Sequence, residues 1–309
     1  MACFFMLSPD FADRYRKYLT SLPCAQLLLC TLALTACTLN NETNSLQDSH
    51  DQTLYELVWA DEFDQETCPS PHSWIHEEAF VRNRELQWFQ PDNAFCKDSI
   101  LIIEARREKK TNPNFFAQSS HWQQNRRFIE YTSASLMTRG LWNWRYGRFE
   151  MRARIPVAPG LWPVFWTMGS RGQWPACGEI DIMESYRGLL LANACWAGDE
   201  QGHPDWNISR HPVTDLGDKW AESFHIWRLE WTEADLRLFV DDRLLNTVDL
   251  QTTLNPPGTV PPNPFQQPHF LILTLAVGGS NGGNPSSTVF PARFEVDYIR
   301  VYQELGMSP

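Results

Sequence analysis

Apolar and polar residues alternate with a period of two in much of this 309-residue chain. The clearest stretch lies at 147–155, where apolar residues alternate strictly with charged ones: Phe149, Met151, Ala153 and Ile155 against Arg148, Glu150, Arg152 and Arg154. Because successive side chains of a strand point to opposite faces of a sheet, this pattern predicts a strand with one buried face.

Further strands are predicted at 57–60, 100–105, 224–231, 236–240, 270–276 and 294–302. Each of these segments is a short apolar run bounded by turn residues. No segment carries the sustained apolar stripe at helical spacing that an amphipathic helix needs. We therefore predict an all-β fold, a two-sheet β-sandwich or jelly roll, in which one curved sheet presents a concave cleft.

The first 37 residues have the features of an export signal. A basic flank at 14–17 precedes an apolar run at 22–36, and that run is too short for a comfortable transmembrane helix. It ends in the letters LTAC at 34–37, which resemble the lipobox of bacterial lipoproteins. The resemblance implies that Cys37 becomes the lipidated first residue of the mature chain, and Thr38 after it favours the outer membrane. The alternative is a soluble secreted protein with an ordinary cleavage site.

The polar residues 38–53 lack aromatic side chains and predict a flexible tether. The remainder, 54–309, has no internal repeat and no second linker, so we predict one domain there. It contains Cys68, Cys96, Cys177 and Cys195, whose spacing fits no zinc site. Export permits disulfides, but the sequence leaves the pairing of these cysteines open.

Charge and aromatic content narrow the function. The chain has 26 Lys and Arg against 37 Asp and Glu, a net charge of −11. This acidity argues against a nucleic-acid partner, because such proteins need a cationic face to displace counterions. The 14 Trp and 18 Phe indicate either a large β core or flat stacking surfaces for a ligand.

Three carboxylates lie close together in an otherwise apolar segment at 179–184. On a strand, Glu179 and Asp181 share a face, and a β-bulge at 182–183 would return Glu184 to that same face. The two glutamate carboxyls would then lie about 5–6 Å apart, the separation expected of a retaining glycosidase. On spacing alone, the alternatives are an acidic strand edge or a structural calcium site.

The segments around these three carboxylates favour the glycosidase interpretation. Residues 174–184 match the motif Trp-Pro-x-x-Gly-Glu-x-Asp-x-x-Glu, and on this motif the chain resembles glycoside hydrolase family 16, the laminarinase-like retaining endo-glycanases. Segments similar to others of the family follow in its order at 57–64, 83–88, 131–134, 146–150, 160–166 and 297–302. The resemblance implies a concanavalin-like jelly roll, with 54–309 as the catalytic domain.

By the same resemblance, Glu179 is the nucleophile, Glu184 the acid/base and Asp181 an assisting carboxylate. It also implies substrate contacts from Trp162, Trp174, Asn83 and Arg148, and an extension of the cleft by Trp88, Trp142 and Trp144.

One departure from the family pattern concerns Cys195, which stands where many laminarinases carry a histidine near the acid/base. A thiol cannot give the charged hydrogen bond of an imidazolium. We therefore expect Asn193 or Trp196 to contribute to substrate binding instead.

The resemblance implies hydrolysis of a β-1,3-glucan or a mixed-linkage β-glucan. The alternatives are a marine galactan (agar, porphyran or carrageenan) hydrolase of the same family and a non-catalytic glycan-binding lipoprotein. We expect no redox or nucleotide cofactor. Family members often hold a structural calcium ion with the equivalent of Asp297, and a site there is the alternative to a metal-free domain. The expected partners are the polysaccharide and, through a lipid anchor only, the membrane; we expect a monomer.

Overall fold

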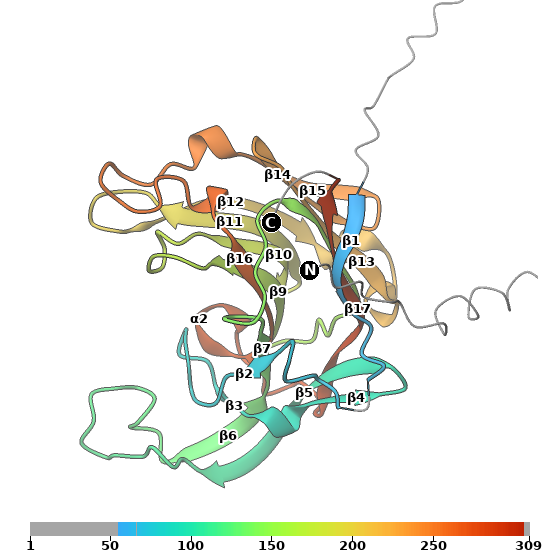
Figure 1. Cartoon of the computed structure of the whole chain (residues 1–309). Coiled ribbons are helices and arrows are strands. Elements are labelled where there is room, and N and C mark those ends of the chain that lie inside the picture. Colours follow the sequence, from blue (N-terminus) through green and yellow to red (C-terminus); the bar gives the residue numbers. More distant parts are fainter. Residues whose placement is uncertain (1–54, 66, 306–309) are drawn as a thin grey trace, which may run out of the picture. The chain divides into compact units, whose positions relative to one another are not determined.

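The computed structural model describes residues 55–65 and 67–305 (Figure 1). The predicted signal segment, the tether and Cys37 lie outside the described residues. Within the described residues, no helix is long and apolar enough to cross a bilayer.

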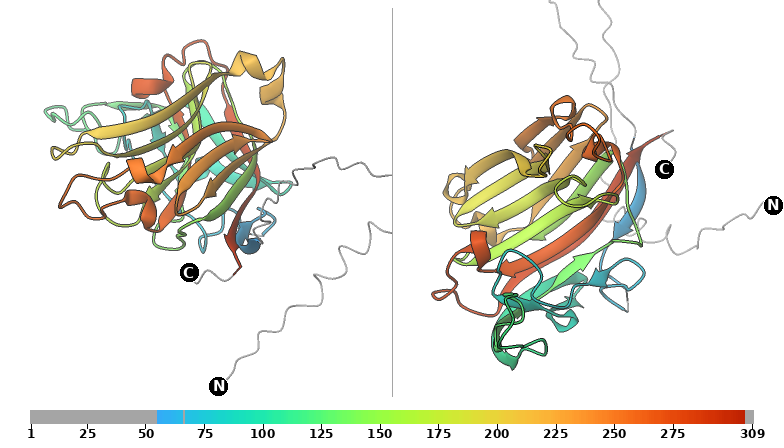
Figure 2. Two further views of the ribbon diagram at one scale, coloured as in Figure 1. Left: turned by 90° about the horizontal axis from the view of Figure 1, so that it is seen from above. Right: turned by 90° about the vertical axis from the view of Figure 1, so that its left-hand side faces the viewer.

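Two antiparallel sheets form a sandwich, as predicted (Figure 2). The seven-stranded sheet has the order β12-β11-β10-β9-β16-β7-β2. Its strands are β2 (Ile75–His76), β7 (Ser135–Met137), β9 (Leu161–Gly169), β10 (Glu179–Tyr186), β11 (Leu189–Ala197), β12 (Pro204–Pro212) and β16 (His269–Val277).

The ten-stranded sheet has the order β15-β14-β13-β8-β17-β5-β6-β3, with β1 paired to β17 and β4 paired to β5. Its strands are β1 (Tyr55–Asp61), β3 (Gln87–Phe89), β4 (Ala94–Lys97), β5 (Ile100–Thr111), β6 (Phe128–Ser133), β8 (Gly147–Arg154), β13 (His225–Trp231), β14 (Asp235–Val240), β15 (Arg243–Asp249) and β17 (Ala292–Glu304). All pairs but β3–β6, which is parallel, run antiparallel.

In the part of the chain that the structure describes, the helices are single turns in the connections. They are η2 (Pro91–Asn93), η3 (Val213–Leu216), η4 (Trp220–Glu222), η5 (Leu250–Thr252), η6 (Pro264–Gln266) and α2 (Gly279–Gly282). The sequence prediction of an all-β chain is therefore confirmed for the described residues.

The main core lies between the two sheets. Strand β8 has the predicted alternation, with Phe149, Met151 and Ala153 fully buried. From the other sheet, Ile180 and Leu190 belong to the same apolar cluster. A second, smaller cluster on the opposite face of the seven-stranded sheet includes Trp162, Val164 and Trp166. That sheet therefore buries one face in the core and offers a partly apolar second face.

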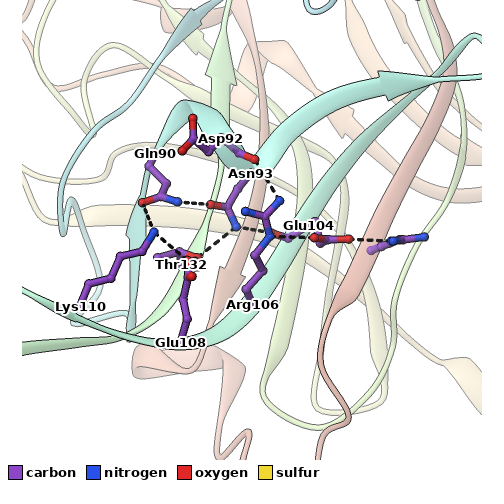
Figure 3. Close-up of polar contacts among 9 residues, drawn as sticks. Gln90, Asp92, Asn93, Glu104, Arg106, Glu108, Lys110 and Thr132 are labelled. Atoms are coloured by element: carbon purple, nitrogen blue, oxygen red, sulfur yellow. Dashed lines mark hydrogen bonds and ion pairs between the residues drawn. The ribbon is translucent and has the colours of Figure 1, made fainter.

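Strand β5 extends six residues beyond the predicted 100–105, through the charged run 106–110. A polar network explains how charged residues continue the strand (Figure 3). Glu104 accepts from Arg106 at 2.7 Å, and the Arg106 guanidinium also donates to the Asp92 carbonyl at 3.0 Å. Lys110 donates to Gln90 at 3.2 Å. These bonds hold the turn at 90–93 against β5.

The cysteine pairing left open by the sequence is resolved. Cys68 and Cys96 form a disulfide that joins the segment after β1 to β4. Cys177 and Cys195 are free thiols, and both are buried.

Candidate active site

The three carboxylates lie on β10, and the predicted bulge is present. Asp181 pairs with Asn193 of β11, whereas Glu184 pairs with Leu191, so one residue of β10 is extra between them. Ile182 and Met183, which form the bulge, are both fully buried in the main core. Glu179, Asp181 and Glu184 consequently share the face that points away from the core, where all three line one cleft.

Glu184 is held by a donor on each oxygen. The Trp162 indole N–H donates to Oε1 at 2.7 Å, and the Asn193 amide donates to Oε2 at 2.9 Å. Burial raises the pKa of Glu184 to about 7, although both hydrogen bonds act to lower it. A carboxyl group with this pKa is largely protonated in mildly acidic solution, as a general acid must be.

Glu179 has a different environment. Its Oε2 accepts a 2.6 Å hydrogen bond from the indole N–H of Trp174, a side chain that is 48% exposed. Burial raises the pKa of Glu179, while the Trp174 bond and a hydrogen bond with Asp181 lower it. The donors around Glu179 therefore favour its ionised form, as a nucleophile requires.

Asp181 lies between the two glutamates. Burial raises its pKa well above the usual range, and the charges of Glu179 and Glu184 raise it further. The hydrogen bond between Asp181 and Glu179 favours the proton on Asp181. Asp181 can thus act as a neutral donor that orients Glu179.

The cleft has a volume of about 570 Å³ and runs across the exposed face of the seven-stranded sheet. Residues of strands β9, β10, β11, β12 and β16 form its floor. Asn83 lines it from the loop before β3, as does Trp174 from the loop before β10. Trp162 lines it as a buried floor residue, so its position favours holding Glu184 over stacking on a sugar.

Two of the predicted substrate contacts lie elsewhere. Arg148 is on β8 of the ten-stranded sheet, where it pairs with Glu230 and covers the Tyr55 ring. Trp196 points into the core and packs edge-on against Phe265, because it has the opposite parity to Asn193 on β11. Both predictions are wrong as to location.

The three tryptophans expected to extend the cleft also lie outside its lining. Trp88 packs against Phe80, and Trp142 and Trp144 stack on each other.

Cys195 lies on the cleft side of β11, directly opposite Glu179 in register, but its side chain is fully buried. Burial raises the pKa of its thiol, and the nearby Glu179 and Asp181 charges add to that effect. The thiol is therefore neutral, and Asn193 is the β11 residue that contacts the carboxylates.

The sequence analysis missed several cleft residues, above all Arg82 and Trp206. Arg82 is next to the predicted Asn83, in a loop where no periodicity indicates orientation. Trp206 is the cross-strand neighbour of Cys195, so its position depends on a pairing between strands that the sequence does not specify.

The residues around Asp297 do not suit a calcium ion. Asp297 is on β17, and its carboxylate accepts a hydrogen bond from Arg152, a cation that competes with a metal. Across 55–65 and 67–305, there is no group of three or more His, Cys, Asp or Glu side chains arranged to hold a metal. We derive no role for a metal.

Comparison with known proteins agrees with this geometry. The model of the family "Glycosyl hydrolases family 16" matches residues 109–300. A beta-glucanase of Rhodothermus marinus is 36% identical over 270 residues, which cover 81% of this chain and 85% of that protein.

Two solved structures are also similar. The laminarinase catalytic domain of Thermotoga maritima MSB8 matches with a TM-score of 0.67 and 31% identity, over 81% of this chain and 99% of that one. A structure described under endo-acting O-glycanases of the human gut microbiota matches with a TM-score of 0.73 and 32% identity, over 81% of this chain and 91% of that one.

A jelly roll with paired glutamates in the cleft of one sheet defines a glycosidase, a hydrolase of O-glycosyl bonds. The similarity to the relatives extends over most of the described chain. The chain belongs to glycosyl hydrolase family 16.

Proposed function

We propose that this protein is a retaining endo-glycosidase that cleaves a neutral β-linked glucan, with β-1,3 or mixed linkage. The observation that carries the proposal is that two glutamates on one strand have different environments, which favour opposite protonation states. Trp162 and Asn193 hold Glu184 in a buried site where its pKa is about 7. Trp174 and Asp181 donate to Glu179 and favour its carboxylate form.

The reaction follows from these environments. The Glu179 carboxylate attacks the anomeric carbon while the Glu184 carboxyl gives its proton to the departing glycosidic oxygen. The glycosyl–Glu179 ester that results is then attacked by water, which loses its proton to the Glu184 carboxylate. Breaking the ester restores the Glu179 carboxylate, and two inversions leave the anomeric configuration retained.

The charge of the cleft supports a neutral substrate. Among the described residues that line it, Arg82 is the one Lys or Arg side chain, and Glu179 is the carboxylate that the site keeps ionised. Arg82 is itself paired with Glu77. A sulfated or carboxylated chain would therefore find no unpaired Lys or Arg side chain among these lining residues to balance its charge. The names of the R. marinus and T. maritima relatives agree with a neutral glucan.

A second candidate is a glycan other than glucan. The TM-score of 0.73 to the structure described under O-glycanases and mucin breakdown favours it. The galactan alternative from the sequence analysis is distinguished by the same polysaccharide panel, described below. The non-catalytic alternative is less well supported, because all three acids are present in the cleft.

We also propose, from residues 1–37 alone, that the protein is exported and anchored to the cell envelope by a lipid on Cys37. Replacing Cys37 with Ala should move the protein from the membrane fraction to the soluble fraction. An unchanged distribution would favour ordinary secretion.

The deciding experiment measures reducing-sugar release by the purified protein on laminarin, mixed-linkage glucan, agarose, porphyran, carrageenan and mucin. Glu179→Ala and Glu184→Ala serve as paired controls. Release from a glucan with retained anomeric configuration, lost in both variants, supports the proposal. Release from mucin or a galactan moves the substrate and keeps the mechanism. Binding without turnover would favour the non-catalytic alternative, and near-normal activity of Glu179→Ala would exclude the mechanism.

A further inference from the structure

Trp206 differs from the other tryptophans of the cleft in its hydrogen bonding. Each of the others donates its indole N–H to a protein group: Trp162 to Glu184, Trp166 to Thr274 and Trp174 to Glu179. Trp206 lines the same cleft, but its indole N–H has no protein acceptor among the described residues. The residue is only partly buried, so part of it remains accessible to a ligand in the cleft.

The register of the sheet fixes where Trp206 lies relative to the carboxylates. Glu179 pairs with Cys195, and Cys195 pairs with Trp206, so these three residues form one row across β10, β11 and β12. Two strand spacings separate the Glu179 and Trp206 backbones, about 10 Å. Between them, Cys195 has a small, fully buried side chain.

A parallel row runs through Asp181, Asn193 and Ile208. Ile208 also lines the cleft and is 39% exposed, which makes it one of the more exposed large apolar side chains of the sheet. The two outer members of these rows, Trp206 and Ile208, thus form an apolar patch on β12, continuous with the catalytic cleft.

The end of the cleft opposite β12 is lined by polar side chains. There the Arg82 guanidinium lies 5.3 Å from the centre of the Trp166 ring and covers it. Asn83 and Glu85, joined by a hydrogen bond of 3.3 Å, line the same end. That end therefore offers polar groups, whereas the β12 end offers an uncovered indole.

We propose that Trp206 and Ile208 form an outer subsite, in which the apolar C–H face of a neutral pyranose ring packs on the indole and a sugar hydroxyl accepts from its N–H. The subsite lies beyond the sugar at Glu179, so it is filled by a chain that extends past the cleaved bond. This inference rests on the proposed function and deepens it: the cleft holds a polymer on both sides of β10, as endo cleavage requires.

The test compares oligosaccharides of increasing length. Kinetics are measured for wild type, Trp206→Ala and Trp206→Phe on β-1,3-gluco-oligosaccharides of three to seven units and on laminarin. Trp142→Ala is the control for loss of a partly exposed tryptophan, because Trp142 is 42% exposed and lies outside the cleft lining.

For Trp206→Ala we expect kcat/KM to fall about three- to tenfold on the longest substrates. The loss should appear mainly in KM, because the subsite binds ground state and transition state alike. The shortest cleaved substrate should be affected less than twofold, and Trp206→Phe should lose less than Trp206→Ala, because it keeps an aromatic face. Trp142→Ala should match wild type at every length.

A loss in Trp206→Ala that is equal at all lengths, or no loss at any length, would overturn the inference, since a merely structural role does not depend on substrate length. These outcomes leave the proposed function intact. If wild type cleaves another polymer of the panel instead of a glucan, the same length series is made from that polymer, and the same comparison decides.

Discussion

The side-chain amide of Asn193 lies 2.9 Å from Oε2 of Glu184, and the same nitrogen lies 3.2 Å from Oδ2 of Asp181. One donor thus serves two buried carboxyl groups on either side of a β-bulge. Because a hydrogen bond to a carboxylate stabilises its charged form, Asn193 lowers the pKa of both groups against the opposing effect of burial.

Replacing Asn193 with Ala should therefore shift the pH dependence of activity. The acid/base must be protonated for the first step, so kcat/KM of the wild type should fall as pH rises through about 7, the pKa of Glu184. Without the Asn193 donor that pKa rises, and the basic limb should move up by about half to one pH unit.

Trp162→Phe provides a comparison, because it removes the donor to the other Glu184 oxygen and should shift the limb in the same direction. The measurement is kcat/KM against pH on one substrate for all three proteins. A basic limb that stays in place or moves to lower pH in both variants would contradict the role of these donors.

The burial of Glu184 should also cost stability at neutral pH. Its pKa in the folded state, about 7, is above the ordinary value of 4.5. Below pH 4.5 the group is protonated in both states and contributes nothing. Between 4.5 and 7 the unfolded state ionises first, so stability declines as pH rises, and above 7 the full penalty applies.

Glu184→Gln should remove that penalty. We expect its free energy of unfolding to exceed that of wild type by about 1–3 kcal/mol above pH 7 and to equal it near pH 4. The Asn193 Oδ1 atom, which lacks a partner among the described residues, can accept from the new amide after the Asn193 side chain rotates. Urea unfolding at the two pH values measures this difference. A variant less stable than wild type at pH 8 would show that the carboxylate stabilises the fold.

The catalytic strand could be predicted from the sequence because its constraints are local. Three acids in six residues must share a face to be useful, and only an extra residue at 182–183 restores the phase of Glu184. The sequence also contains the alternation along β11. Asn193 and Trp196 are three positions apart, so if Asn193 faces the cleft, Trp196 must face the core.

Other features depend on distant pairings, which one sequence does not specify. A period of two distinguishes the buried face of a strand from the exposed face, but it does not tell which exposed face bears the cleft. Arg148 lies on the exposed face of β8, as the alternation predicts, but β8 belongs to the ten-stranded sheet and the cleft lies on the seven-stranded sheet. Trp206 reaches the cleft only because β12 adds to β11 in a particular register. Arg82 reaches it from the loop between β2 and β3, whose path the sequence does not specify.

Cys177 and Cys195, the free thiols of the described residues, should be inert in the folded protein. Burial raises the pKa of Cys177 to about 11 and also raises that of Cys195. Since the thiolate is the reactive form, neither should be alkylated by iodoacetamide at pH 8 in the native state, and both should be alkylated after unfolding. Mass spectrometry counts the added groups. Rapid labelling of Cys195 in native protein would mean that the cleft exposes it, contrary to its full burial between Glu179 and Trp206.

The disulfide between Cys68 and Cys96 should contribute measurably to stability. It joins two residues 28 positions apart, and closing a loop of that length restricts the unfolded chain by about 3–4 kcal/mol. Cys96→Ser should lower the free energy of unfolding by that order in oxidising buffer. In buffer with a strong reductant, wild type should become as unstable as the variant. Neither cysteine lines the cleft, so activity at 25 °C should be unchanged. Equal stability of the two proteins in oxidising buffer would mean that the native fold is held without this bond.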